Sequence, residues 1–209
     1  MPNNYDPVAR CYDFLSQLVF GQTEIDAQVG MLDLVRPGDR LLIVGGGTGW
    51  ILEKIAALCP PGLTITYVES SSKMMALARG RKWGSNCVDF VRLPVEQFVS
   101  DERFDCILTG FLFDNFRQEQ AAEIVRRLDG LLLAGGHWLF ADLYCPRVGG
   151  TWWQRLLLRS MYWSARLICR VEANELPDMD VCFGGVGYME VRRGSYYHGF
   201  IQSVIYRKG

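Results

Sequence analysis

Short apolar runs alternate with amphipathic segments along the first two thirds of the chain. The apolar runs predict strands near 41–44, 63–68, 87–93, 104–109 and 137–143. Apolar residues at three- and four-residue spacing between these runs predict helices over 50–58, 72–80 and 117–129. Such alternation requires right-handed crossovers, so we expect an α/β fold with a parallel sheet that binds ligands at the carboxyl ends of its strands.

The pattern changes in the last third of the chain. Residues 152–171 are predicted to form one long helix, and 188–207 to form two strands that meet around Gly194 or His198–Gly199. An antiparallel pair is the simplest arrangement for two consecutive strands that a short turn joins. The length of 209 residues fits one domain, which we expect to cover the whole chain.

The most informative segment is 41–49, where an apolar run ends in closely spaced glycines just before an amphipathic segment. Gly45, Gly47 and Gly49 carry no Cβ, so a nucleotide-like ligand can approach the turn and reach the free N–H groups of the helix start. Glu69 follows the second apolar run, where a carboxylate can accept hydrogen bonds from both ribose hydroxyls. The pairing predicts an adenosine-type ligand, although it also occurs in dinucleotide enzymes. In the alternative interpretation, the glycines serve only helix–strand packing and Glu69 is a solvated strand-end residue.

Composition narrows the class of partner. The chain has 22 basic and 23 acidic side chains and a formal net charge of −1, so we expect no global electrostatic surface for nucleic acid. Its seven cysteines are widely spaced without a Cys-x-x-Cys pair, which predicts reduced thiols and no metal site. The first residues lack a basic stretch followed by an apolar run, so no signal peptide is visible and we expect a cytoplasmic protein.

Five motifs along the chain together point to a known family. They are Tyr5-Asp6-Pro7-Val8-Ala9-Arg10-Cys11-Tyr12-Asp13, the glycine turn, Val68-Glu69-Ser70-Ser71-Ser72-Lys73-Met74-Met75, Phe104-Asp105-Cys106-Ile107-Leu108 and Leu133-Ala134-Gly135-Gly136-His137. With these motifs the chain resembles the class I S-adenosylmethionine-dependent methyltransferases, especially the small-molecule branch that includes the ubiquinone and menaquinone biosynthesis methyltransferases. The resemblance implies a Rossmann-like, doubly wound sheet of seven strands, mostly parallel with an antiparallel last strand, with helices on both faces. It also implies S-adenosylmethionine as the cofactor and S-adenosylhomocysteine as its product.

The resemblance implies roles for residues around the glycine turn. The methionine and ribose side of the cofactor would lie against three glycines, Gly45, Gly47 and Gly49. Glu69 would hold the ribose, and the border between ribose and adenine would be formed by Ser70 and Met74. Ile43 departs from the family, which usually has a carboxylate at this position toward the methionine amino group.

Other implied contacts lie elsewhere along the chain. The adenine edge would be wrapped by Leu93, Pro94 and Val95, and many family members have aspartate where Pro94 stands. The sulfonium would lie beside the end of the fourth strand, at Thr109, Gly110 and Phe111. An N-terminal lid that contains Tyr5 and Tyr12 would close over the cofactor and the acceptor.

These roles divide the single domain 1–209 into three parts. Residues 1–36 would form the lid and a helix, 37–150 the cofactor-binding core, and 151–209 a helix and the terminal strand pair on the acceptor side. The 152–171 helix has four arginines on one side, flanked by two tryptophans: Arg155, Arg159, Arg166, Arg170, Trp152 and Trp163. Its charges exclude a spanning helix, but such a helix can rest on an anionic membrane surface or face an amphiphilic acceptor. The alternative is an ordinary helix with its arginines in water.

Two residues are candidates for a catalytic base. Methyl transfer from a sulfonium is an in-line displacement, so the protein chiefly aligns the acceptor, and a base helps with a phenol, a hydroxyl or an acidic C–H. His198 lies between the last two strands, and Asp142 lies at the carboxyl end of the fifth. The alternatives are an exposed turn histidine and a carboxylate that caps the following loop.

The leading hypothesis is transfer of a methyl group to a small, apolar or amphiphilic organic acceptor, at oxygen or carbon. An enzyme that methylates bases or glutamine at nitrogen would have an Asn-Pro-Pro-Tyr type sequence where this chain has Thr109-Gly110-Phe111-Leu112. The alternative hypothesis is a cofactor-binding or partner-binding protein with weak or no turnover on the same fold. Both a monomer and a homodimer agree with the sequence.

Overall fold

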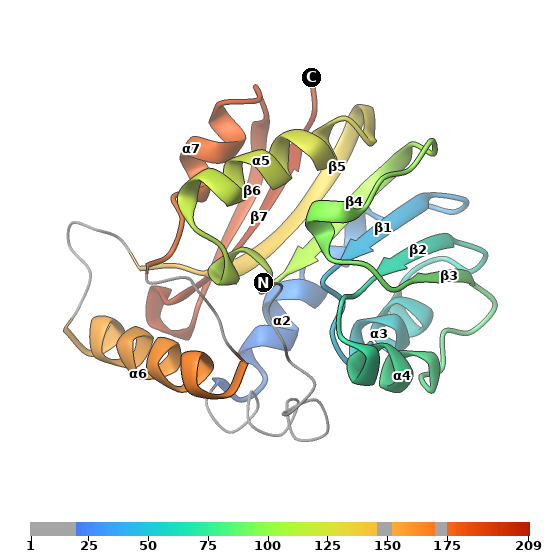
Figure 1. Ribbon diagram of the computed structural model, residues 1–209. Coiled ribbons are helices and arrows are strands. Elements are labelled where there is room, and N and C mark those ends of the chain that lie inside the picture. Colours follow the sequence, from blue (N-terminus) through green and yellow to red (C-terminus); the bar gives the residue numbers. More distant parts are fainter. Residues whose placement is uncertain (1–19, 146–151, 170–174) are drawn as a thin grey trace.

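In the part of the chain that the structure describes, seven strands form one sheet through the middle of the molecule (Figure 1). The computed structural model describes residues 20–145, 152–169 and 175–209, and the side chains of its longest helix as far as Met161. The strands lie in the order β3-β2-β1-β4-β5-β7-β6. Their bounds are β1 Arg40–Val44, β2 Thr64–Val68, β3 Cys87–Val91, β4 Phe104–Gly110, β5 Leu132–Leu143, β6 Met189–Tyr196 and β7 Ile201–Arg207.

The sheet is mostly parallel. Neighbouring strands from β3 through β5 pair in parallel, whereas β7 runs antiparallel to both β5 and β6. This arrangement confirms the predicted Rossmann-like sheet with an antiparallel last strand. The carboxyl ends of β1, β4 and β5 lie along one edge, and the start of β7 joins them because Leu143 pairs with Ile201. We call this line of strand ends the carboxyl edge.

Helices cover both faces of the sheet (Figure 1). One face is covered by α2 Thr23–Val29, α3 Trp50–Leu58 and α4 Ser72–Arg79, and the other by α5 Gln118–Asp129 and α7 Met179–Gly184. The helix α6, Trp152–Cys169, lies beyond the carboxyl end of β5. Across the described ranges, no helix combines the length and the apolar character needed to cross a lipid bilayer.

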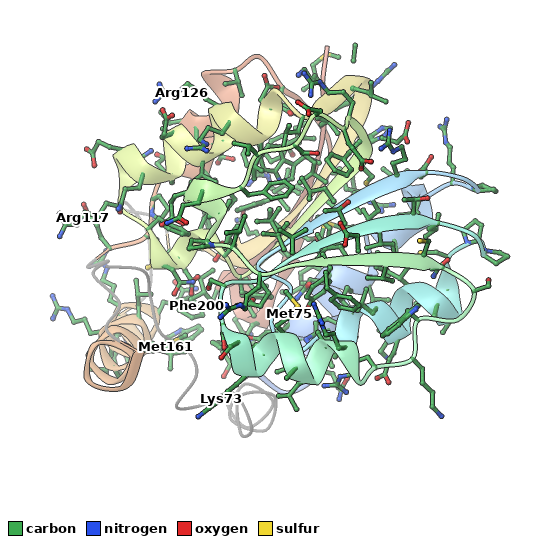
Figure 2. All side chains as sticks on the ribbon, turned by 45° about the vertical axis from the view of Figure 1, so that its right-hand side comes forward. Lys73, Met75, Arg117, Arg126, Met161 and Phe200 are labelled. Atoms are coloured by element: carbon green, nitrogen blue, oxygen red, sulfur yellow. The ribbon has the colours of Figure 1, made fainter. Side chains whose placement is uncertain are left out.

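Two apolar cores form, one on each face of the sheet. The strand β1 shows why, because its side chains alternate between the faces and both faces are covered. Leu41 and Ile43 lie in the core beneath α2, α3 and α4, and Leu42 lies in the core beneath α5 and α7. Met75 of α4 and Phe200, just before β7, belong to the first core (Figure 2). The glycine turn therefore follows a strand that is buried at every residue after Arg40.

Two elements differ from the sequence-based expectation. β5 begins at Leu132 and not near 137, because Gly135 adopts a φ of +75° and the chain continues as an irregular strand. A Cβ at Gly136 would lie 2.8 Å from the Asp105 carbonyl oxygen, so glycine also permits this close approach. The helix α7 was not predicted, since its six residues are too short for a helical period to show.

Candidate functional site

The turn between β1 and α3 has the conformation that its glycines predict. Gly45, Gly47 and Gly49 have φ values of +68°, +61° and +79°, a region that glycine adopts without strain. The Gly45 N–H donates to the Val68 carbonyl oxygen at 2.9 Å, which ties the turn to the end of β2. A Cβ at Gly49 would lie 2.6 Å from the Ala78 Cα, so this glycine has a packing role between α3 and α4.

Tyr67 packs against the glycine turn, a contact that the sequence did not predict. Its side chain is fully buried, and its hydroxyl donates to the Gly47 carbonyl oxygen at 3.1 Å. A Cβ at Gly46 would overlap the Tyr67 ring, so the backbone of this residue lies directly on the aromatic face. The signal for this contact in the sequence was Gly46, the middle one of three consecutive glycines.

Glu69 connects the turn to the start of α4. Its carboxylate is buried, with 6% of the residue exposed, and accepts from the Gly47 N–H at 3.0 Å and from the Ser71 N–H at 2.7 Å. The Ser70 hydroxyl donates to the same carboxylate at 3.4 Å. Burial raises the pKa of Glu69, while these donors favour the ionised form and oppose the shift.

The residues predicted around the ribose and adenine are brought together in part. Ser71 caps α4 by accepting from the Met74 N–H at 3.2 Å, and the buried Met74 sulfur would lie 3.9 Å from a Cβ at Gly47. The predicted adenine edge follows β3: Leu93 and Pro94 are half-buried, and Val95 is buried in the core beneath α5 and α7. Tyr5 and Tyr12 lie outside the described residues, so the predicted lid stays a prediction.

A cleft opens between the glycine turn, the end of β4 and α2. We call it the glycine cleft, and its lining is Glu24, Gln28, Ile43, Val44, Gly45, Gly46, Gly47, Thr48, Trp50, Ile51, Leu108, Gly110 and Phe111. Four predicted residues, Gly45, Gly47, Gly110 and Phe111, thus meet in one place. Glu24 and Gln28 were not predicted, and their spacing of four residues on α2 is the signal that places both on one helix side. The Gln28 amide lies so close to Gly110 that a Cβ there would overlap it.

Thr109 and Phe111 flank Gly110 at the end of β4. The Thr109 side chain points away from the glycine cleft, and its hydroxyl accepts from the indole N–H of Trp138 at 2.9 Å. Phe111 has a φ of +53°, which is unusual for an aromatic residue, and its N–H donates to the Ala141 carbonyl oxygen at 2.8 Å. This conformation turns the chain at the carboxyl edge, where Phe111 lines the cleft.

Asp142 lies at the carboxyl end of β5 and is almost completely buried. Its carboxylate accepts from the backbone N–H groups of Phe113 and Leu143, both at 2.8 Å, and thereby caps the 3₁₀ turn Phe113–Asn115. Burial raises the pKa of Asp142 to about 7 against the effect of these donors. Asp114 lies nearby, and burial together with the charges of Asp142 and Glu24 raises its pKa well above the usual range. Asp142 thus caps the following loop, which was the predicted alternative to a role as a base. Its proximity to a second buried carboxylate, Asp114, was not revealed by the sequence.

A second cleft begins at Asp142. We call it the β5 cleft, and its lining is Phe140, Asp142, Leu143, Tyr144, Cys145, Leu176, Pro177, Asp178, Met179, Asp180, Arg193 and Gln202. Asp142 borders this cleft. Through Asp114, whose pKa is raised by the charges of both Asp142 and Glu24, it is linked electrostatically to Glu24 in the lining of the glycine cleft. The lining combines apolar side chains with a nearly equal share of polar and charged ones.

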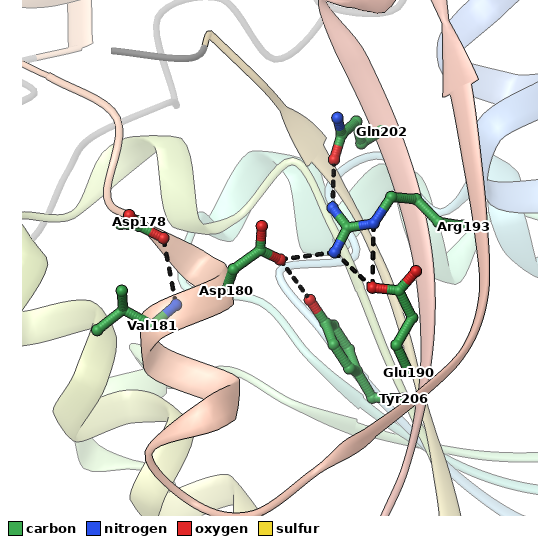
Figure 3. A network of polar contacts seen from close by, with 7 residues as sticks. All are labelled: Asp178, Asp180, Val181, Glu190, Arg193, Gln202 and Tyr206. Atoms are coloured by element: carbon green, nitrogen blue, oxygen red, sulfur yellow. Dashed lines mark hydrogen bonds and ion pairs between the residues drawn. The ribbon is translucent and has the colours of Figure 1, made fainter. Parts of the chain in front are cut away.

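A polar network fixes one wall of the β5 cleft (Figure 3). The Arg193 guanidinium contacts Asp180 at 2.6 Å, Glu190 at 2.7 Å and Gln202 at 2.5 Å. The Tyr206 hydroxyl donates to Asp180 at 3.1 Å. These contacts join α7 to β6 and β7. Because the Arg193 guanidinium is engaged in all three of its contacts, this side chain forms part of the cleft wall.

His198 lies in the turn Tyr197–Gly199 between β6 and β7, at the carboxyl edge. Its ring is exposed and lies edge-on to Trp153 of α6, with 6.3 Å between ring centroids. Its carbonyl oxygen accepts from the Gln154 amide at 3.2 Å. The structure does not bring the His198 side chain into the lining of either described cleft, so its predicted role as a base stays a prediction.

Comparison with known proteins agrees with this geometry. A family model described as a methyltransferase domain matches residues 42–138, which hold the glycine turn, Glu69 and the end of β4. The ubiquinone/menaquinone biosynthesis C-methyltransferase UbiE of Pseudomonas putida is 26% identical over 148 residues, covering 68% of this chain and 57% of that protein. This chain therefore matches little more than half the length of such curated relatives.

Solved structures show the same fold. Magnesium protoporphyrin IX methyltransferase ChlM from Synechocystis PCC 6803, with bound S-adenosylhomocysteine, has a TM-score of 0.66 at 16% identity, over 88% of this chain and 82% of that one. The cyclopropane synthase MmaA2 from Mycobacterium tuberculosis has a TM-score of 0.65 at 17% identity, over the same shares. The sheet and its helices thus form the same Rossmann-like fold as these two proteins. The family match over residues 42–138 and the shared fold together confirm the predicted resemblance.

The pKa of Asp142 predicts a pH dependence of stability. Its folded value of about 7 exceeds the ~3.9 of an unfolded chain, so the folded state binds this proton more tightly. The resulting stabilisation is complete below the unfolded pKa and is lost as the pH rises through the folded pKa. We expect the free energy of unfolding of the wild type to fall relative to that of Asp142→Asn between about pH 4 and pH 7.

Denaturant titrations at a series of pH values measure this difference. Asp101→Asn, which changes an exposed carboxyl group, should retain the pH dependence of the wild type. Parallel curves for the wild type and Asp142→Asn would contradict the assignment.

Proposed function

We propose that this protein transfers a methyl group from S-adenosylmethionine to a small, apolar or amphiphilic organic acceptor, at oxygen or carbon. The observation that carries the proposal is the buried Glu69 carboxylate, which the N–H groups of Gly47 and Ser71 hold beside the glycine turn. A carboxylate in this place can accept hydrogen bonds from the ribose hydroxyls of an adenosine ligand. The methyltransferase-domain match over the same residues supports this choice of ligand.

The glycine cleft fits such a cofactor at its methionine end as well. The turn presents backbone without Cβ atoms, and α3 begins directly after it, so N–H groups of the helix start suit a ligand carboxylate. Ile43 offers no charge to the methionine ammonium group, but Glu24 of α2 lines the same cleft. We assign the ammonium group to Glu24, whose carboxylate takes the place of the one missing at residue 43. When bound, the cofactor supplies a methyl group that its sulfonium has already activated.

The protein's own residues then align the acceptor and manage its proton. The β5 cleft has apolar walls that include Phe140, Leu143, Leu176 and Met179, which suit an apolar or amphiphilic molecule. Asp142 borders this cleft, and its pKa of about 7 suits a group that takes a proton from an acceptor hydroxyl or acidic C–H near neutral pH. His198, at the same edge, is the second candidate for this role. The curated relatives are named for C-methylation in ubiquinone and menaquinone biosynthesis, which favours an aromatic acceptor with an apolar part.

The second candidate function is a cofactor-binding protein without turnover. The observation that favours it is Ile43, which is fully buried in the position beside the cleft where a carboxylate was expected. Calorimetry with S-adenosylhomocysteine and transfer of a labelled methyl group to a panel of quinols and phenols separate the two. The proposal predicts binding below millimolar concentrations and labelled product. Binding without any labelled product would favour the second function, and no binding at all would contradict both.

The assignment of Glu24 has its own test. Glu24→Gln should weaken S-adenosylhomocysteine binding about tenfold, because it removes the charge from one charge-assisted hydrogen bond. The same variant should leave the affinity for 5′-methylthioadenosine unchanged, since this ligand has the adenosine but not the ammonium group. Calorimetric titration with both ligands measures the contrast.

Asp26→Asn is the matched control, because Asp26 is an exposed carboxylate on the same helix. It should change neither affinity. Equal losses for both ligands in Glu24→Gln would show that the residue acts through the structure of the cleft and not through the ammonium group.

A further inference from the structure

The described part of α6 has two faces of different character. Its inner face is buried or half-buried, and four of its side chains pack against the core beneath α2, α3 and α4: Trp153, Leu157, Leu158 and Met161. Figure 2 shows Met161 on this inner side. The other side is exposed along its whole described length, at Trp152, Arg155, Leu156, Arg159 and Ser160. We call these five residues the outer face of α6.

Large apolar side chains on the outer face are open to solvent. Trp152 is 76% exposed and Leu156 is 60% exposed. Single exposed apolar residues are normal on protein surfaces. These two lie four residues apart, so they are neighbours on one side of the helix and form a continuous apolar strip. Such a strip is typical of a surface that contacts another phase or molecule.

Positive charge accompanies the apolar strip. Arg155 and Arg159 also lie four residues apart on the outer face, and neither forms an ion pair with a carboxylate in the part of the chain that the structure describes. The sequence from 146 to 171 contains five arginines and no acidic residue. An anionic partner is therefore complementary to this surface, whereas the chain as a whole carries a net charge of only −1.

We propose that the outer face of α6 docks on the surface of an anionic lipid bilayer. Tryptophan and leucine bury their apolar surface at the boundary of headgroups and acyl chains, and the arginines contact lipid phosphates. The helix lies in the plane of the membrane, since it lacks the apolar length to cross it. The docking does not depend on the proposed methyl transfer.

Docking would place the β5 cleft close to the membrane surface. Cys145 and Leu176 line this cleft, and both pack against the same core as the inner face of α6. A bilayer that contacts the outer face would thus lie across α6 from the core that these two cleft residues share with its inner face. An amphiphilic acceptor dissolved in the membrane would have a short path to the cleft.

Vesicle flotation of the full chain tests the proposal. The wild type should bind vesicles of phosphatidylcholine mixed with phosphatidylglycerol, and bind far less to vesicles of phosphatidylcholine alone. Arg155→Gln with Arg159→Gln should weaken binding about tenfold or more, because each arginine near an anionic surface contributes a several-fold gain in affinity. Trp152→Ala with Leu156→Ser should weaken it to a similar degree through the lost apolar contact.

Arg117→Gln with Arg126→Gln is the matched control. It removes the same charge from exposed positions at α5, which lies on the other face of the sheet (Figure 2), and should leave vesicle binding within about twofold of the wild type. Circular dichroism should show all variants folded, since every substituted side chain is exposed. The proposal is overturned by absent binding to the anionic vesicles, by equal binding to the neutral ones, or by an equal loss in the control. It is also overturned if light scattering shows a dimer that Trp152→Ala with Leu156→Ser converts to a monomer.

Discussion

The carboxylate of Glu69 accepts from the N–H groups of Gly47 and Ser71, and this interaction joins the two loops on which the site depends. One loop is the glycine turn after β1, and the other is the start of α4 after β2. Both are fixed by strands that are buried on each face. Burying a carboxylate without hydrogen-bond partners costs free energy. The two N–H donors therefore fix the Glu69 side chain, and the carboxylate in turn fixes the two loops. The cradle is thus largely formed before a ligand arrives.

The residues around the glycine turn are also closely packed. The Tyr67 ring packs against the backbone of Gly46, and its hydroxyl donates to the Gly47 carbonyl oxygen. Both contacts fix the conformation of the turn. Gly49 lets the start of α3 approach Ala78, which lies near the end of α4. Close packing and the proposed cofactor recognition are therefore compatible explanations for this run of glycines, since Gly49 permits the contact with Ala78 while Gly45, Gly46 and Gly47 line the glycine cleft.

Much of this arrangement could be predicted from the sequence. The alternation of apolar runs and helical periods gave the order of strands and helices, and the glycines with Glu69 marked the edge that holds the site. The electrostatic interaction of Asp114 with both Glu24 and Asp142 could not be predicted, since the three carboxylates come from distant elements and no spacing relates them. The direction of the Thr109 side chain depends on which face of β4 it occupies, and the short helix α7 has no period to detect. Contacts between distant elements, and elements of one or two turns, need the folded structure.

The most direct measurement is the affinity of Glu69→Gln for S-adenosylhomocysteine, compared with the wild type and with Glu119→Gln, an exposed control on α5. A neutral amide cannot accept from both N–H groups and from the ribose with the strength of a carboxylate. The account predicts that binding weakens about tenfold or more in Glu69→Gln and is unchanged in Glu119→Gln. An unchanged affinity in Glu69→Gln, in protein that remains folded, would contradict the central role of this carboxylate.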